Sequence, residues 1–250
     1  MKHAGLWRLA IVAGAVLALE LACRGGIINR ITMVPPSEMA VALARMSGDA
    51  WFWSDAGSTF RNIGVAIVLS IVPGFLIGLA IHELPRLRRV LNPVLLSWYS
   101  VPTFVFYPLL IVIFGIGQAS LIVMGAMFGI VAMISATLAS MDRIPQVYGK
   151  AARAIRLSRW QTALRIRLPA AMPHLITGIR LAVAYSFIGV IAGEFIISTA
   201  GLGRRLTLAY NSFDTATMYG LILLIFIVVA MVNGLLQRWE ARVHRRWYRA

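Results

Sequence analysis

Few residues of this 250-residue sequence have the types and spacing that enzyme chemistry needs. The four histidines, which could bind a metal or move protons, are far apart, and no pair of carboxylates or nucleophile motif accompanies them. Two Gly-X-Gly motifs begin at Gly115 and Gly201, but neither continues to the Gly-Lys-Ser/Thr ending that cradles a nucleotide phosphate. We therefore expect no catalytic residue, metal or cofactor in this chain, and no ATP hydrolysis by it alone.

One acidic residue lies where a charge is costly. Glu194 falls inside an apolar run, near Tyr185 and Ser186, and an uncompensated charge at membrane depth costs about 2.5 kcal/mol or more. It should be paired, protonated or turned toward a polar cavity. Two roles stay open for it: a gate or pathway residue near the outer end of its span, and a structural carboxylate that caps the loop that follows.

A second candidate site is the polar stretch 142–173, which interrupts the apolar second half of the chain and carries seven of its 24 Lys and Arg residues. Pro145 suits the first turn of one helix, and Ser158 followed by Gln161 is typical of a capping box that opens another. An amphipathic helix-turn-helix between two apolar runs, without metal ligands or a nucleophile, predicts a docking surface for another protein.

The two helices of this stretch should meet near Arg156 and Leu157. Pro169 and Pro173 should then end the stretch, because proline lacks the N–H that a helix interior uses. Membrane-grade sequence begins directly after them, at His174.

The stretch resembles the EAA loop of ABC-importer permeases. That loop has a Glu-Ala-Ala triplet, then a Gly, then a hydrophobic-Pro pair, and Lys150-Ala151-Ala152, Arg156 and Leu168-Pro169 occupy these places. The spacing fits, while Lys150 replaces the family's Glu and Arg156 its Gly. Further matches cover most of the chain and look most similar to the nitrate/sulfonate/taurine branch: Pro35-Pro36-Ser37, Ser58, Arg61, Pro102, Tyr107-Pro108-Leu109, Phe114–Gly117, Gly178-Ile179-Arg180, Glu194 and Gly201-Leu202-Gly203.

The resemblance implies the transmembrane subunit of a type I ABC importer. It implies a homodimer around a shared pathway, two cytoplasmic ATPase subunits that bind ATP and Mg, and a periplasmic solute-binding protein. The residues expected to contact the ATPase are Tyr148, Lys150, Ala151, Ala152, Arg153, Arg156, Leu157 and Pro169. The residues expected in the translocation pathway or gate are Pro102, Tyr107, Tyr185, Ser186 and Glu194.

Composition agrees with a polytopic membrane protein. The chain is 60% hydrophobic and 13% charged, whereas a soluble domain is typically about 25% charged. The net charge of +15 lies at the ends of apolar runs and is not accompanied by a nucleic-acid-binding motif, which argues against nucleic acid as a partner. A single cysteine, Cys23, excludes an intrachain disulfide.

The chain reads as one all-α permease domain with six apolar segments of spanning length, which is about 20 residues. The segments are residues 6–23, 62–82, 93–114, 119–140, 174–198 and 216–237. The third should be bent by Pro102 and Pro108, with Gly115–Gln118 as the hinge before the fourth. The connection that contains Gly201 should be a short loop, and a basic tail should begin at Arg238.

The first 58 residues leave alternatives open. Residues 1–23 are either a retained helix, which we favour, or a cleaved signal peptide. Residues 24–58 look loop-like, and Ser37–Met46 is either an amphipathic helix on the membrane surface or part of a packed loop.

Orientation follows from the basic residues. If both termini and the segments 83–92 and 141–173 face the cytoplasm, that side holds 17 Lys and Arg, against six on the other side. This positive-inside bias predicts a multi-pass membrane protein with both termini in the cytoplasm, and the resemblance implies that the membrane is the inner membrane of a bacterium.

Three functions fit the sequence and the resemblance. The first is an importer subunit for a sulfonate, taurine or nitrate-like solute, and the second is the same kind of permease for a heterocycle such as a pyrimidine or riboflavin precursor. The third is an ion-coupled transporter that uses Glu194. A membrane-embedded enzyme would show clustered acids or histidines, which the sequence lacks.

Overall fold

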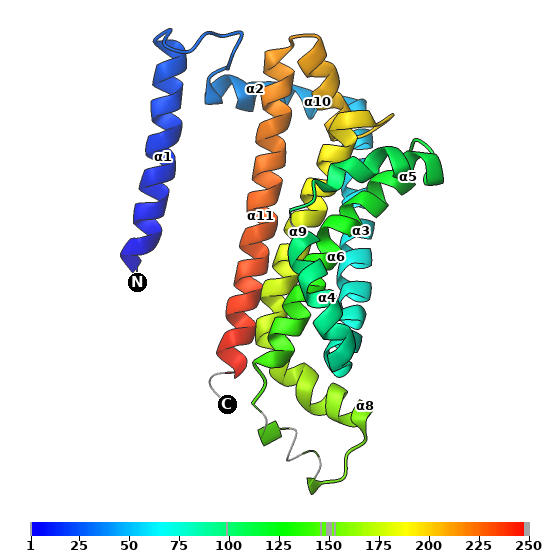
Figure 1. Ribbon diagram of the computed structural model, residues 1–250. Helices are drawn as coiled ribbons and strands as arrows, with labels where there is room; N and C mark the ends of the chain where they lie inside the picture. The colour runs from blue at the N-terminus through cyan, green and yellow to red at the C-terminus, as the bar shows by residue number, and fades with distance from the viewer. Residues whose placement is uncertain (1, 99, 146, 149–151, 153, 248–250) are drawn as a thin grey trace. The chain divides into compact units, whose positions relative to one another are not determined.

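The structure, a computed structural model, describes residues 2–98, 100–145, 147–148, 152 and 154–247. All regular elements among these residues are helical, as the sequence predicted (Figure 1). In chain order they are α1 (Lys2–Arg24), α2 (Pro36–Met46), α3 (Ala50–Glu83), α4 (Pro85–Trp98), the 3-10 helix η1 (Thr103–Phe106), α5 (Tyr107–Phe114), α6 (Gln118–Asp142), α8 (Arg159–Thr162), the π-helix η2 (Ala163–Arg167), α9 (Leu168–Ile197), α10 (Leu202–Asn211) and α11 (Thr215–Trp247).

The chain forms two compact units. The first contains Met1–Thr59 and Glu194–Ala230, and the second contains Phe60–Gly193 and Met231–Ala250. In the first unit, side chains from α2, the start of α3, α10 and the start of α11 form one apolar cluster. The second unit is built around α3, α6 and α9 and has apolar clusters of its own.

Close helix packing in the second unit depends on small residues. A Cβ on Gly129 of α6 would lie 2.5 Å from the Ser70 hydroxyl of α3 and 2.6 Å from the Ser186 hydroxyl of α9. A Cβ on Gly125 would lie 2.5 Å from Val190 and 3.0 Å from Ala66. These distances are shorter than van der Waals contact, so glycine is what lets the three backbones approach.

Four helices within the described residues are long and apolar enough to cross a membrane, and there are five if the bent pair α4 and η1–α5 counts as one span. The four are Ala50–Glu83, Gln118–Asp142, Arg165–Ile197 and Thr215–Val243. Helix α1 covers the predicted first segment, 6–23, and its crossing of the membrane stays a prediction.

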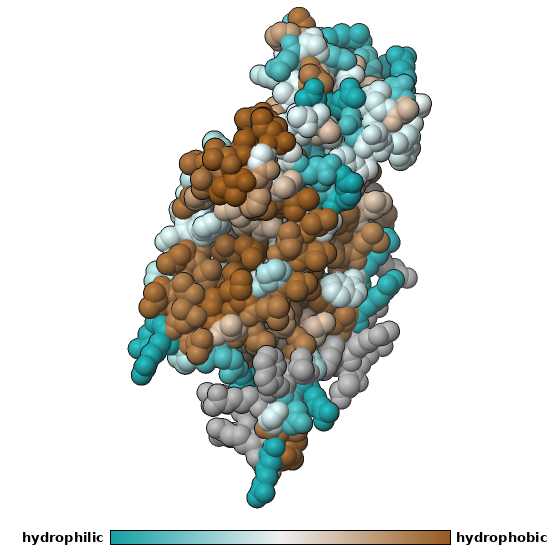
Figure 2. Space-filling view, turned by 90° about the vertical axis from the view of Figure 1, so that its right-hand side faces the viewer, coloured by the Kyte–Doolittle hydropathy of each residue, from teal (hydrophilic) through white to brown (hydrophobic). Residues whose placement is uncertain are grey.

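Apolar side chains cover a broad part of the molecular surface, as Figure 2 shows. On the part of α3 that belongs to the second unit, Val68 is 58% exposed, Val72 52% and Leu76 57%. A surface of this kind is stable against lipid or against another apolar chain, and not against water.

Three expected boundaries were wrong. Helix α3 begins at Ala50, so residues 50–58 are helical and not loop-like, because Phe52 and Ala56 pack inward on one face of that helix. The expected loop after the fifth segment contains α10. Helix α11 continues to Trp247 through most of the expected tail, where Glu240 accepts hydrogen bonds from Arg180 (2.6 Å) and Thr177 (2.9 Å) of α9.

The third predicted segment, 93–114, is two helical pieces that meet at 98°. Pro102 is the N-cap of η1, and Pro108 lies in the first turn of α5, where its missing N–H has no helical partner to lose. Pro102 therefore lies at the bend, as predicted, whereas Pro108 lies beyond it, at the start of α5. Helix α5 ends at Phe114 with Gly115, whose φ is +78°, as its C-cap, and α6 begins directly after Gly117, which confirms the expected hinge.

Pro169 and Pro173 do not end the polar stretch in the way we expected. Helix α9 begins at Leu168, so Pro169 lies in its first turn and Pro173 lies inside it. The preceding residues, Ala163–Arg167, form the π-helix η2. A proline gives no N–H to the carbonyl four residues before it and crowds that carbonyl, and a wider π turn relieves both effects without ending the helix.

Candidate functional site

The stretch 142–173, called here the coupling segment, forms two helical pieces. Val147, Tyr148, Ala152 and Ala154 have helical backbone, and α8 begins at Arg159. Three residues expected to contact an ATPase, Lys150, Ala151 and Arg153, lie outside the described residues.

The turn between the two pieces has a left-handed residue where the EAA loop has glycine. Arg156 has φ +52°, and the N–H of Leu157 donates to the carbonyl of Ala152 at 3.0 Å. This bond, with a left-handed residue before it, is the Schellman ending of a helix. A non-glycine residue in this conformation costs about 1–2 kcal/mol, so Arg156 bears strain that glycine would not.

A capping box opens the second helical piece, as the sequence predicted. The N–H of Gln161 donates to the Ser158 hydroxyl at 3.2 Å, and the N–H of Ser158 donates to the Gln161 side chain at 3.0 Å. Both ends of the turn are therefore held by local hydrogen bonds, so the shape of the turn is set by its own sequence.

Apolar side chains on this segment face outward. Val147 is 70% exposed, Tyr148 47% and Ile155 66%, whereas Ala152 is 1% exposed. Exposed apolar groups on a short, capped helical segment are typical of a protein-binding surface. Pro169 belongs to α9 and helps to fix where the segment rejoins that helix.

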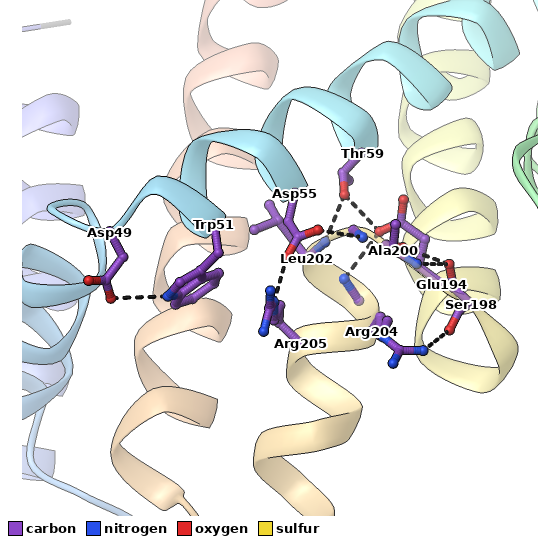
Figure 3. A network of polar contacts seen from close by, with 12 residues as sticks. Asp49, Trp51, Asp55, Thr59, Glu194, Ser198, Ala200, Leu202, Arg204 and Arg205 are labelled. Atoms are coloured by element: carbon purple, nitrogen blue, oxygen red, sulfur yellow. Dashed lines mark hydrogen bonds and ion pairs between the residues drawn. The ribbon is translucent and has the colours of Figure 1, made fainter.

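The second site surrounds Glu194 at the end of α9 and lies entirely in the first unit (Figure 3). Glu194 is 0% exposed. Its Oε2 accepts a hydrogen bond from the Thr59 hydroxyl at 2.7 Å and from the N–H of Gly203 at 3.1 Å. A carboxylate at the N-terminus of a helix is stabilised by the free N–H groups and by the helix dipole.

Three consecutive N–H groups at the start of α10 each donate to a different side chain. Gly201 donates to Asp55 (3.1 Å), Leu202 donates to Thr59 (2.9 Å), and Gly203 donates to Glu194 (3.1 Å). Asp55 and Thr59 belong to α3, and Glu194 belongs to α9. The first turn of α10 is thereby tied to two other helices of its unit.

The conformation of Gly201 explains why the Gly-Leu-Gly motif surrounds this carboxylate. Gly201 has φ +104°, and a Cβ built on it would lie 2.5 Å from Oε2 and 2.6 Å from Oε1 of Glu194. The carboxylate therefore occupies the space that any other side chain would need. The motif therefore surrounds the carboxylate of Glu194, and that space is not open to a phosphate.

The network extends to the molecular surface through Asp55. The Nε of Arg205 donates to Asp55 at 2.5 Å, and its guanidinium lies 4.6 Å from the centre of the Trp51 ring. Sequence reasoning missed Asp55 and Thr59 because it treated their segment as a loop. Their spacing of four residues, which places both on one face of a helix, was the available signal.

The other expected pathway residues belong to the second unit. In the second unit the Ser186 hydroxyl is 2.9 Å from that of Ser70, and both side chains are fully buried, which makes a bond between α9 and α3. Tyr107 is 2% exposed among Leu110, Leu121 and Met124. Pro102 is exposed and Tyr185 half-buried.

In both arrangements the polar groups hold helical segments in place. No group of three or more His, Cys, Asp or Glu side chains that could hold a metal occurs in the described part of the chain. Glu194 is held by a hydroxyl and a backbone N–H and has the geometry of a helix cap.

Comparison with known proteins identifies the family. The family described as "binding-protein-dependent transport system inner membrane component" matches residues 67–248. The chain belongs to this family. It is therefore a membrane protein of the ABC-importer permease type, and the resemblance drawn from the coupling segment is confirmed.

Relatives have several named substrates. The chain is 28% identical to the taurine transport system permease protein TauC of Escherichia coli over 87% of its own length and 81% of the relative's. It is 27% identical to the nitrate import permease protein NrtB of Leptolyngbya laminosa (77% and 68%) and 30% identical to the riboflavin transport system permease protein RibX of Chloroflexus aurantiacus (62% and 60%).

Solved structures agree on the fold. A chain of the MetNI methionine ABC transporter in an inward-facing conformation matches with a TM-score of 0.65 at 21% identity, over 84% of this chain and 99% of that one. A chain of an amino acid ABC transporter with histidines matches with a TM-score of 0.60 at 13% identity, over 83% and 98%. The fold is that of the type I importer permeases.

Proposed function

We propose that this chain is the permease subunit of an ABC importer that moves a small solute across the bacterial inner membrane. The observation that carries the proposal is the coupling segment, which is capped at both sides of its turn and presents exposed Val147, Tyr148 and Ile155 between α6 and α9. Family membership supports the same function. ATP hydrolysis takes place in a separate subunit, because the chain has no phosphate-binding motif of its own.

The proposed assembly has two copies of this chain, two cytoplasmic ATPase subunits that bind ATP and Mg, and a periplasmic solute-binding protein. Both termini and the coupling segment lie in the cytoplasm, as the excess of basic residues on that side supports. When the ATPases close on ATP, they push the coupling segment, and the spanning helices move as rigid bodies from inward-facing to outward-facing.

The proposed substrate is a small oxyanion of the sulfonate, taurine or nitrate kind. Two of the relatives with good coverage are named for taurine and nitrate, which supports this choice. A heterocyclic substrate is the second candidate, and the relative named for riboflavin favours it. The cap geometry of Glu194 argues against the third candidate, in which Glu194 couples transport to an ion.

Co-purification tests the assembly. The full chain, purified in mild detergent from its own cells, should retain a stoichiometric ATPase whose hydrolysis of ATP is blocked by vanadate. Lys150→Glu should weaken this association by reversing a charge, and Ala151→Trp should weaken it sterically. If both variants kept all of the ATPase, the coupling segment would not be the docking surface.

Labelling from the two sides of the membrane tests the topology. In a Cys23→Ser background, a cysteine at Ile155 in the coupling segment and one at Asn211 at the end of α10 should react from opposite sides with an impermeant maleimide. Reaction of both from outside would contradict the proposed orientation. Binding of radiolabelled taurine, nitrate or riboflavin to the partner solute-binding protein then decides the substrate.

A further inference from the structure

Both ends of the coupling segment are ion-paired to one corner of the second unit. Helix α3 ends at Glu83, and α4 begins at Pro85, so the chain turns a corner there. Arg88 of α4 pairs with Asp142, where the coupling segment begins. Arg167, near the other end of the segment, pairs with Glu83.

The first pair has a fixed geometry. Nη1 of Arg88 donates to Oδ1 of Asp142 at 2.7 Å, and Nη2 donates to Oδ2 at 2.5 Å. Two parallel bonds between a guanidinium and a carboxylate fix direction as well as distance. The Nδ1 atom of His82 lies 3.7 Å from the same Oδ1, so α3 also approaches this carboxylate.

The charges allow one arrangement of the segment on the corner. The corner presents an acid, Glu83, and a base, Arg88, while the segment presents an acid at its start and a base near its end. Exchanging the two ends would place Arg167 against Arg88 and Asp142 against Glu83. Like charges so placed repel, so the pattern selects the observed arrangement.

Helix α4 is largely exposed. None of its residues is fully buried, and only its partly buried Leu91 and Leu95 pack against the apolar cluster of Ile81, Ile134 and Leu138. The paired side chains are 32% to 47% exposed. Pairs this exposed add little to folding stability, so what they contribute here is orientation.

We infer that Glu83 and Arg88 are the receiving end of the coupling, and that the two ion pairs make the coupling segment and the α3–α4 corner move as one body. This rests on the proposed function. One ion pair can act as a pivot, whereas two pairs at separate points prevent rotation about either. A push on the segment then reaches α3 and α4 together, without first deforming the turn at Arg156. The four side chains are positioning residues and do not contact substrate.

A distance measurement on the full chain tests the geometry. In a Cys23→Ser background, spin labels at Ile155 and Arg86 report the separation of the segment from the corner, in lipid nanodiscs without any ATPase. In the wild type the segment should be held against the corner, which gives a narrow distribution of label distances. The reversals Asp142→Arg and Arg167→Glu should each raise the fraction of molecules in which the segment has moved away from the corner by about fivefold, which is the largest effect expected from one exposed ion pair. The double variants Asp142→Arg/Arg88→Asp and Arg167→Glu/Glu83→Arg should restore the narrow distribution.

A matched control uses an ion pair of the first unit. Arg30 and Glu38 form a pair at 2.8 Å whose side chains are 72% and 42% exposed. Glu38→Arg should leave the distance between the two labels unchanged. If the double variants failed to restore the distribution, or if Glu38→Arg broadened it equally, the inference would be overturned.

The same labels test transmission in the complete complex. With the co-purified ATPase bound, ATP and vanadate should leave the wild-type distance unchanged, because the segment and the corner move together. In Asp142→Arg the distance should change on ATP binding. A nucleotide-dependent change in the wild type would overturn the inference alone, whereas absence of the ATPase from the wild-type complex would overturn the proposed function.

Discussion

The N-terminal ends of α2 and α10 are both capped by a glutamate from the long helix before them, and the two caps differ in burial. At α2, Glu20 accepts from the N–H of Ser37 at 3.0 Å and pairs with Arg24, with its side chain 18% exposed. At α10, Glu194 accepts from the N–H of Gly203 at 3.1 Å and is 0% exposed. The same hydrogen bond therefore occurs in two different surroundings.

The difference in burial determines how much stability each glutamate cap contributes. Water can replace Glu20, because a partly exposed N–H can be hydrated when its acceptor is removed. Water cannot easily reach the start of α10, so loss of Glu194 leaves polar groups buried without a partner. Removal of the cap of α10 should therefore displace that helix, whereas removal of the cap of α2 should only lower the stability of α2 slightly.

The largest effect is expected from Glu194→Leu, and Glu20→Leu is the matched comparison. Glu194→Leu should lower the free energy of unfolding by about 3 kcal/mol, because the Thr59 hydroxyl and the Gly203 N–H both lose their acceptor. Glu194→Gln should lose less, since an amide oxygen still accepts one hydrogen bond. Glu20→Leu should cause a much smaller loss. Thermal unfolding in detergent measures all three, and equal shifts for the two leucine variants would contradict the comparison.

Gly201→Ala tests the space around the buried cap. The new Cβ would collide with the carboxylate at 2.5 Å in a backbone region that only glycine favours, so we expect a loss of about 2 kcal/mol or more. Gly26→Ala is the matched control, because its φ is +76° and its Cβ would meet nothing within 4 Å. It should lose about 1 kcal/mol from backbone strain alone. A stability assay in which both variants behaved alike would show that the carboxylate is not fixed there.

Thr59→Val keeps the shape of the side chain and removes its hydroxyl. The N–H of Leu202 then loses its acceptor and Glu194 loses a donor, which should cost about 1–2 kcal/mol. Hydrogen–deuterium exchange should rise in the peptide that covers α10. Ser37→Ala, which removes the corresponding hydroxyl beside Glu20, should raise exchange in α2 less. A larger rise in α2 would reverse the proposed order of the two caps.

The smallest effect is expected at the helix end near Arg156, where the left-handed residue is not glycine. Arg156→Gly should stabilise the chain by up to about 1 kcal/mol, because glycine adopts φ +52° without the strain that arginine bears there. Ala154→Gly, at a helical position two residues earlier, should instead destabilise by about 1 kcal/mol. Urea titration of the two variants should give shifts of opposite sign. A loss in Arg156→Gly would mean that the arginine side chain makes a stabilising contact.

Sequence alone determined the features that depend on neighbouring residues. Ser158 and Gln161 form their capping box because both partners lie within one turn of helix, and Gly115 and Gly117 form the hinge because their backbone conformations are local. The all-α class and the family also followed from sequence, since apolar runs and motif spacing need no tertiary contact.

Only the tertiary structure decided which groups Glu194 contacts and where several helices end. Two of the three acceptors for the start of α10, Asp55 and Thr59, lie more than a hundred positions away, and no local pattern pairs Thr59 with Glu194. The pairing of Asp142 with Arg88 across 54 positions is of the same kind. Periodicity shows that a residue is buried or charged, but its partner is chosen by how the helices pack, and that choice depends on the whole chain at once.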